Sequence, residues 1–197
     1  MSKSSRRERC FAKPVIPVVS DLSCGPAALA PATCVILQGM GIVDLPDLVT
    51  AFESGSLKEV CLLVHVDLIA GLENNDAGLE FLAQFPRIDG IVTVHHHLIG
   101  AARRLDLFSI ARIFLSDSRA LERGLKALAK TPPDVVDLLP AAAAVHVADE
   151  FKKVRIPRIA GGLCRTADDV RAAIESGCLS VTSTLPLLWQ LNSPPQQ

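Results

Sequence analysis

The feature that most constrains the fold is a regular alternation of short apolar segments with longer amphipathic ones along the chain. The apolar segments are rich in Val, Ile and Leu, which is typical of buried parallel strands. Strands are predicted at residues 15–19, 33–37, 60–66, 90–94, 109–115, 135–139, 158–160 and 179–182.

Helical patterns separate these segments. Helices are predicted over 75–84, 117–130, 142–153 and 166–175, whereas 21–33 and 185–191 give the weakest helical patterns. Asp117 and Thr166 are good N-caps, and Gly177 is suited to end the last of these helices. The alternation predicts an α/β fold, a compact TIM-type (β/α)8 barrel in a single domain over residues 14–191. An open doubly wound sheet is the alternative.

Composition narrows the class of protein. With 20 basic against 21 acidic residues, the chain has no overall charge that favours nucleic acid. The six cysteines form no C-x-x-C pair, which favours reduced thiols in a cytoplasmic protein. No signal peptide and no apolar run of membrane-spanning length is visible, so no membrane partner is expected.

The two ends of the chain are polar. Residues 1–13 contain five basic side chains against Glu8 and are predicted to be a flexible basic arm. Residues 192–197, Asn-Ser-Pro-Pro-Gln-Gln, are predicted to be a disordered tail.

A glycine pair marks the first candidate site. Gly161 and Gly162 end a short apolar run just before the helix that begins near Thr166. Glycine lets a backbone approach a ligand closely, and the loops after strands 7 and 8 of a barrel commonly form a phosphate site. Arg165 is well placed for a phosphate there, although the glycines also suit tight strand-to-helix packing and a surface arginine is ordinary.

Three further polar residues belong to predicted strands or their ends. His65 and Asp67 lie two residues apart, so both side chains are expected on one face, where they could orient a hydroxyl or exchange protons. Arg112 lies within an apolar strand and needs an anionic partner. That partner is a ligand phosphate, Asp67 or another internal carboxylate.

The run His95-His96-His97 is the only candidate for metal binding, and it is a weak one. Adjacent residues of an extended segment point in opposite directions, so at most His95 and His97 could share an ion. No metal, cofactor or catalytic residue is predicted. No nucleotide-binding or nucleophile motif occurs, and no lysine lies well inside a strand, as Schiff-base aldolase chemistry would need.

The chain resembles the glycerol-3-phosphate-responsive antiterminator family over roughly residues 14–190. The resembling segments are Val64-His-Val-Asp-Leu-Ile-Ala-Gly-Leu72, Ala77-Gly-Leu-Glu-Phe81, Ile88-Asp-Gly-Ile-Val92, Arg112-Ile-Phe-Leu-Ser-Asp-Ser118, Pro133-Asp-Val-Val-Asp-Leu-Leu-Pro140 and Pro157-Arg-Ile-Ala-Gly-Gly-Leu-Cys-Arg-Thr-Ala-Asp-Asp-Val170.

The resemblance implies a TIM-barrel regulator that binds glycerol 3-phosphate and acts on leader mRNA, so that transcription of glycerol-utilisation genes passes a terminator. It also implies roles for site residues. The phosphate would be held by Gly161, Gly162, Thr182, Ser183 and Thr184, and the glycerol side would be lined by His65, Asp67 and Arg112.

This chain departs from the family pattern at four places near the expected mouth of the barrel. These are Gln38-Gly-Met-Gly41, Val94-His95-His96, Pro140-Ala141 and Thr184-Leu185. Two alternatives therefore stand beside the regulator: an isomerase or lyase acting on a small phosphorylated metabolite, and a barrel whose ligand specificity is altered or lost. An oligomer is possible. The basic groups available for RNA are the amino-terminal arm, Arg103-Arg104, and Lys152-Lys153 with Arg155 and Arg158.

Overall fold

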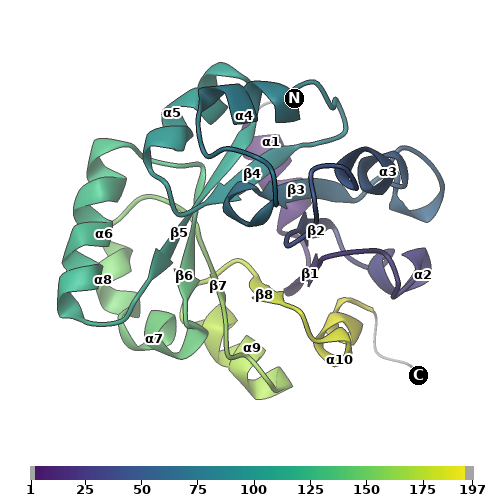
Figure 1. Cartoon of the computed structure of the whole chain (residues 1–197). Coiled ribbons are helices and arrows are strands. Elements are labelled where there is room, and N and C mark those ends of the chain that lie inside the picture. Colours follow the sequence, from purple (N-terminus) through teal and green to yellow (C-terminus); the bar gives the residue numbers. More distant parts are fainter. Residues whose placement is uncertain (1–2, 194–197) are drawn as a thin grey trace.

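The computed structural model describes residues 3–193, in which parallel strands close into a barrel in the order of the sequence (Figure 1). The last strand pairs with the first, since Val15 is opposite Val181 and Ile16 is opposite Thr182. This closure confirms the predicted (β/α)8 barrel and excludes the open doubly wound sheet. The strands are β1 (Val15–Val19), β2 (Cys34–Leu37), β3 (Cys61–His65), β4 (Gly90–Thr93), β5 (Phe108–Phe114), β6 (Val135–Leu139), β7 (Arg158–Gly161) and β8 (Val181–Ser183).

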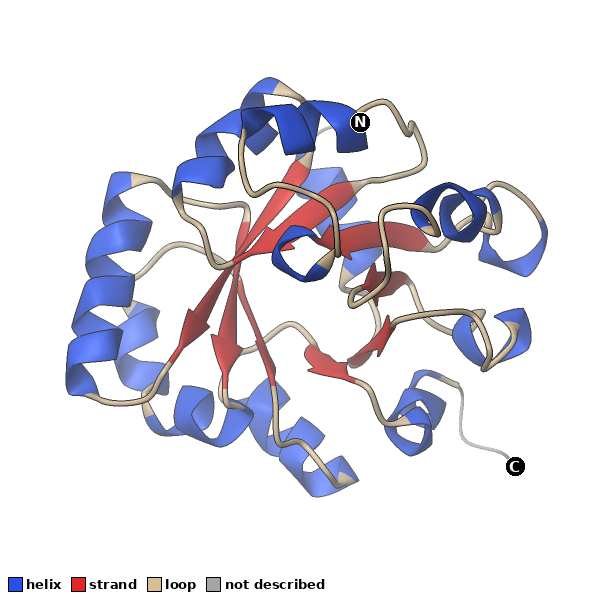
Figure 2. Cartoon of the chain, in the orientation of Figure 1, coloured by secondary structure: helices blue, strands red, loops and turns tan. Residues whose placement is uncertain are grey.

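Helices surround the barrel on its outer side (Figure 2). They cover it with a second apolar layer, because alternate strand residues such as Val35, Leu62 and Val136 point outward and are fully buried. The helices are α1 (Lys3–Cys10), α2 (Pro26–Leu29), α3 (Leu45–Thr50), α4 (Asp76–Leu82), α5 (His97–Arg104), α6 (Ser118–Lys130), α7 (Ala141–His146), α8 (Ala148–Lys152), α9 (Ala167–Glu175) and α10 (Pro186–Trp189), with 3₁₀ helices η1 (Gly55–Leu57), η2 (Val66–Leu68) and η3 (Gln190–Asn192).

The interior of the barrel changes character along its axis. Inward-facing side chains from the amino-terminal and middle parts of the strands are apolar, as with Phe108 and Ile110 of β5. Two residues further along the same strand, and still facing inward, comes Arg112. The barrel is therefore filled with apolar side chains at the amino-terminal end and with polar ones at the carboxyl-terminal end.

The structure corrects one predicted helix. The pattern over 142–153 predicts a single helix, but the chain forms α7 and α8 with a break at Val147, whose ψ of 23° is not helical. Asn75, Asp117 and Thr166 act as N-caps, each accepting a hydrogen bond from a backbone N–H three residues on.

The prediction of a flexible arm over residues 1–13 is wrong for its described part. Residues Lys3–Cys10 form α1, which lies behind the strands in the view of Figure 1. Arg9 makes a 2.9 Å ion pair with Asp89, and Cys10 and Phe11 are buried among the interior side chains at the amino-terminal end of the barrel. The burial of these two apolar residues outweighs the polar composition of the segment and closes that end of the barrel.

The cysteines follow the prediction from composition. All six are free thiols, and five of them are buried, with Cys24 the exposed one.

The predicted tail over 192–197 begins too early, because Asn192 is almost fully buried. Its side chain accepts a hydrogen bond from the Val15 backbone N–H at 3.1 Å and donates one to the Val15 carbonyl at 2.8 Å. Residues 194–197 lie outside the described part of the chain.

We expect Asn192→Ala to lower the free energy of unfolding by about 2 kcal/mol, because two buried backbone groups of β1 lose their partner. Urea denaturation measures the change. Gln190→Ala, an exposed substitution in the same 3₁₀ helix, is the control and should leave stability unchanged. Equal stability of the two variants would contradict this role of Asn192.

Candidate functional site

A cavity of about 290 Å³ opens at the carboxyl-terminal ends of the strands. This is the end of a (β/α)8 barrel at which ligands bind. The lining residues come from β1, β5, β6 and β8 and from the segments after β2, β7 and β8: Val18, Gln38, Arg112, Leu139, Gly162, Leu163, Cys164, Arg165, Thr182, Ser183, Thr184 and Leu185.

A second cavity of about 390 Å³ adjoins the first and shares Val18, Gln38 and Thr184 with it. It extends toward Asp21 and Trp189, and neither arginine lines it. We therefore place the anion-binding potential in the first cavity, although the second is larger.

Arg112 forms the floor of the first cavity, and its internal partner is Asp137. The two residues are direct register partners on β5 and β6, and the Arg112 Nε lies 2.9 Å from Asp137 Oδ2. Asp137 is fully buried, and its second carboxylate oxygen has no hydrogen-bond partner in the part of the chain that the structure describes. Burial raises the pKa of the Asp137 carboxyl, and the guanidinium opposes that rise.

His65 and Asp67 lie close to this floor but do not line the cavity. Strand β3 ends at His65 and Asp67 belongs to η2, so the expected extended spacing is replaced by a turn. Asp67 instead accepts hydrogen bonds from the Thr93 hydroxyl and the Val94 N–H, both at 2.6 Å. It still lies 3.7 Å from His65 Nδ1.

The His65 imidazole is neutral at neutral pH. Burial and the nearby Arg112 guanidinium lower its pKa to about 4, against the opposing effect of Asp67. Its Nδ1 is buried and has no hydrogen-bond partner among the described residues.

Gly161 and Gly162 have different structural roles. Gly161 is opposite Thr182 across β7 and β8, and a Cβ at Gly161 would lie 1.9 Å from the Thr182 hydroxyl oxygen. The glycine thus makes room for a hydroxyl at the cavity wall. Gly162 has φ = 71°, a conformation that strains any other residue, and a Cβ there would approach Leu139 at 3.4 Å. A substitution at Gly162 would therefore strain the turn as well as alter the cavity.

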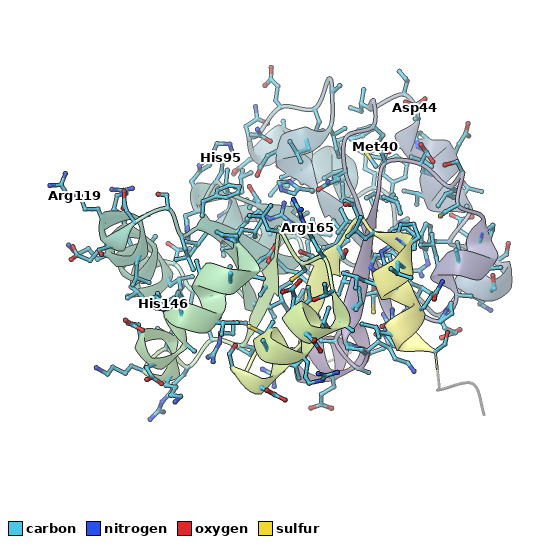
Figure 3. All side chains as sticks on the ribbon, turned by 90° about the horizontal axis from the view of Figure 1, so that it is seen from below. Met40, Asp44, His95, Arg119, His146 and Arg165 are labelled. Carbon is cyan, nitrogen blue, oxygen red and sulfur yellow. The ribbon has the colours of Figure 1, made fainter. Side chains whose placement is uncertain are left out.

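Arg165 lines the cavity just before helix α9, and Figure 3 marks its position. The adjacent amino-terminal amides of the helix are already occupied, because Asp169 Oδ2 accepts hydrogen bonds from the backbone N–H groups of Arg165 and Thr166 at 2.9 Å. An anion here would be held by the Arg165 side chain rather than by these amides.

The residues of β8 and its exit supply hydroxyl groups. Thr182 and Ser183 are buried, and Thr184 is exposed. The Ser183 hydroxyl accepts a hydrogen bond from the Leu185 N–H at 3.1 Å, and the Ser183 carbonyl accepts one from the Trp189 indole at 2.9 Å. Since the Ser183 oxygen serves as an acceptor, its hydrogen remains available to a ligand.

The histidine run brings two rings together without forming a metal site. The ring centroids of His95 and His97 are 5.6 Å apart. Nowhere in the described part of the chain do three or more His, Cys, Asp or Glu side chains gather so that they could hold a metal ion.

The four departures from the family pattern divide into two groups. Gln38 and Leu185 line the cavity, whereas Val94-His95-His96 and Ala141 do not. Ala141 donates a backbone hydrogen bond to the Gly162 carbonyl and so supports the turn after β7. A changed ligand preference would thus arise through Gln38 and Leu185.

The chemistry of the cavity is that of an anion receptor. It has two guanidinium groups, three hydroxyls and one amide, and no Asp, Glu, His or Lys lines it. Its only ionisable acid is the Cys164 thiol, whose pKa is raised to about 11, chiefly by burial. Arg112, Gly162, Arg165, Thr182, Ser183 and Thr184 line this one cavity, and Gly161 lies directly behind Thr182. Their role in binding a ligand stays a prediction.

Asp137 is the functional residue that sequence reasoning missed. Its signal was present, since Asp137 is the only charged residue within the apolar segment 135–139. A buried charge of this kind requires a partner of opposite sign.

The structure is a (β/α)8 barrel with an arginine-lined cavity at the carboxyl ends of its strands. Residues 15–189 match the model of the family described as glycerol-3-phosphate responsive antiterminator. The chain belongs to this family.

Solved structures agree with this assignment. The glycerol uptake operon antiterminator regulatory protein from Listeria monocytogenes str. 4b F2365 is 28% identical, with a TM-score of 0.79, covering 90% of this chain and 95% of that one. A glycerol uptake operon antiterminator-related protein from Thermotoga maritima MSB8 has a TM-score of 0.80 at 24% identity, over 90% of this chain and 98% of that one, and supports the fold.

A relative in Escherichia coli (strain K12) is the uncharacterized protein YgcP. It is 33% identical over 128 residues, which are 65% of this chain and 67% of YgcP. Among the described residues, no helix has both the length and the apolar character needed to cross a membrane.

Proposed function

We propose that this protein binds glycerol 3-phosphate in the first cavity and, in the liganded state, acts on leader mRNA so that transcription passes a terminator. The observation that carries the proposal is a small cavity that pairs two arginines with hydroxyl groups, in a chain of the glycerol-3-phosphate responsive antiterminator family. Arginine is well suited to bind phosphate because its planar guanidinium donates two parallel hydrogen bonds.

Within the cavity, Arg165 and the hydroxyls of β8 and its exit would hold the phosphate at the mouth. The glycerol part would lie deeper, over Arg112. His65 and Asp67 would act indirectly, since both lie behind the floor and neither lines the cavity. This arrangement favours binding over turnover, because no carboxylate, imidazole or lysine that could act as a general base lines the cavity and the Cys164 thiol is protonated at neutral pH.

A thermal-shift titration tests the ligand. Glycerol 3-phosphate at about 100 times its dissociation constant should stabilise the protein by about 2.7 kcal/mol, whereas glycerol and inorganic phosphate should each give a much smaller shift. A flat response to all three compounds would contradict the proposed ligand.

The variant Arg165→Gln tests whether Arg165 binds the phosphate group of glycerol 3-phosphate. Loss of a charge-assisted hydrogen bond should raise the dissociation constant of glycerol 3-phosphate at least about tenfold without lowering the melting temperature of the free protein. Arg171→Gln is the matched control, because Arg171 is an exposed arginine of α9 that does not line the cavity. Equal affinities of the two variants for glycerol 3-phosphate would show that Arg165 does not bind the phosphate.

RNA function is tested separately by transcription through a terminator in vitro. Read-through that rises with protein and glycerol 3-phosphate together, but with neither alone, is the expected result. Cytoplasmic location is part of the same proposal, since leader mRNA is found there.

A further inference from the structure

One helix carries on its outer face a row of positive charges that form no ion pair with the described residues. Helix α6 presents Arg119, Arg123, Lys126 and Lys130, all four exposed. Their spacings of four, three and four residues keep them on one side of the helix. We call these four residues the α6 stripe.

The opposite side of α6 fixes the helix to the barrel. Ala120, Gly124 and Leu128 are its buried residues, and a Cβ at Gly124 would lie 3.0 Å from the Ile113 side chain of β5. The α6 stripe therefore faces solvent, as Arg119 does in Figure 3, where it projects away from the barrel.

The α6 stripe differs from several other basic side chains of the surface, which have an ion-pair partner. Lys152 and Arg171 each pair with an aspartate three residues earlier on their own helix, and Arg104 pairs with Asp76 of α4. Among the ion pairs of the described residues, none involves a member of the α6 stripe. The one acid on α6, Glu122, leaves the helix with a net positive charge.

The positive charges of the α6 stripe repel one another. Arg119 and Arg123, like Lys126 and Lys130, are like charges four residues apart, and such pairs destabilise a helix. A polyanion along the helix would relieve this repulsion. The chain as a whole has a net charge of −1, so the positive charge is a local property of this face.

We propose that the α6 stripe is the surface that contacts the sugar-phosphate backbone of RNA. The inference rests on the proposed function. The stripe spans about 16 Å along the helix axis, which is long enough to meet several successive phosphates. Arg103 extends it, because its guanidinium donates a 2.7 Å hydrogen bond to the carbonyl of Pro132, just after α6.

The position of α6 also links the proposed ligand site to the proposed RNA surface. Strand β5 carries Arg112 into the cavity and leads directly into α6. A ligand that engages Arg112 acts on the strand whose next residue, Ile113, packs against Gly124 at the centre of α6. Ligand and RNA would thus contact the inner and outer sides of one βα unit.

The test compares two full-length variants with equal changes of charge. The first replaces the α6 stripe by glutamine (R119Q, R123Q, K126Q and K130Q). The second, a control, makes K152Q, K153Q, R155Q and R171Q on exposed residues of the segment after α7 and of α9. The probe is a fluorescein-labelled RNA with a G·C-rich hairpin followed by uridines, and binding is followed by anisotropy with glycerol 3-phosphate present.

Wild-type affinity should fall steeply with salt. Four backbone contacts give about a fifty-fold loss between about 50 and 200 mM salt, at a slope of about −0.7 per contact. The α6 variant should bind at least about tenfold more weakly and lose most of this salt dependence, while its melting temperature is unchanged or higher. The control should bind as wild type does.

The outcomes separate this inference from the proposed function. Wild-type-like RNA binding by the α6 variant overturns the inference and leaves the function standing, as does loss of binding in the control alone. Absence of RNA binding by the wild-type protein, with and without glycerol 3-phosphate, overturns the proposed function together with the inference.

A second measurement does not depend on variants. RNA should protect Lys126 and Lys130 from acetylation, read by mass spectrometry, while Lys152 and Lys153 stay reactive. The reverse pattern of protection would overturn the inference.

Discussion

Asp137→Ala should lower the free energy of unfolding by about 3–5 kcal/mol, because it leaves the buried Arg112 guanidinium without its counter-charge. The Arg112 side chain is only 8% exposed and its Nε donates to Asp137 at 2.9 Å. Urea denaturation in a buffer free of phosphate measures the loss, since phosphate could replace the missing carboxylate.

A double variant shows whether the loss of stability in Asp137→Ala comes from the unpaired charge of Arg112 or from the space left by the smaller side chain. Arg112→Met combined with Asp137→Leu removes both charges and should recover most of the stability, because well-packed apolar residues can replace a buried ion pair at little cost. The same variant should no longer respond to glycerol 3-phosphate. If Asp137→Ala costs less than about 1 kcal/mol, the pair does not hold the barrel floor together as we describe.

Acidification should destabilise the protein through His65. The pKa of the buried imidazole is about 4 in the folded protein against 6.5 for an ordinary histidine, so only the unfolded chain takes up this proton between those values. Stability therefore falls as the pH is lowered from about 6.5 to about 4, and His65 contributes about 3 kcal/mol of that fall.

His65→Asn isolates this contribution. The substituted residue does not titrate, whereas His96, whose pKa is also lowered by burial, and the carboxylates titrate in both proteins. The difference in unfolding free energy between wild type and variant should therefore shrink as the pH falls from 7 to 4. A difference that is constant with pH would mean that His65 is not held neutral by burial and Arg112.

The strands and the glycine pair at the end of β7 could be predicted because both depend on local patterns. Short Val-rich segments alternate with capped helices at Asp117 and Thr166, and a (β/α)8 barrel brings strand ends together whatever the details of packing. Arg165 and Thr182 to Thr184 follow from their places at those ends.

Other features depend on contacts between distant segments. Asp137 is visible as a charge in an apolar strand, but its pairing with Arg112 requires the register of β5 against β6. The closure of the amino-terminal end of the barrel by Cys10 and Phe11 rests on two apolar residues after a polar run, too few to form a pattern. The α6 stripe can be read from the spacing of its basic residues, but only the structure shows that this side of α6 faces solvent and has no ion-pair partner among the described residues.

One end of this barrel contributes to stability, and the other end carries the cavity. Apolar packing with Phe11 and Cys10 closes the amino-terminal end, while the cavity with its arginines occupies the other, and the Arg112–Asp137 pair lies between them. Cavity residues such as Gln38 and Leu185 can therefore be substituted without disturbing the apolar packing that closes the amino-terminal end. A barrel divided in this way can acquire a new metabolite specificity through a few substitutions at the mouth of its cavity, while the fold itself is unchanged.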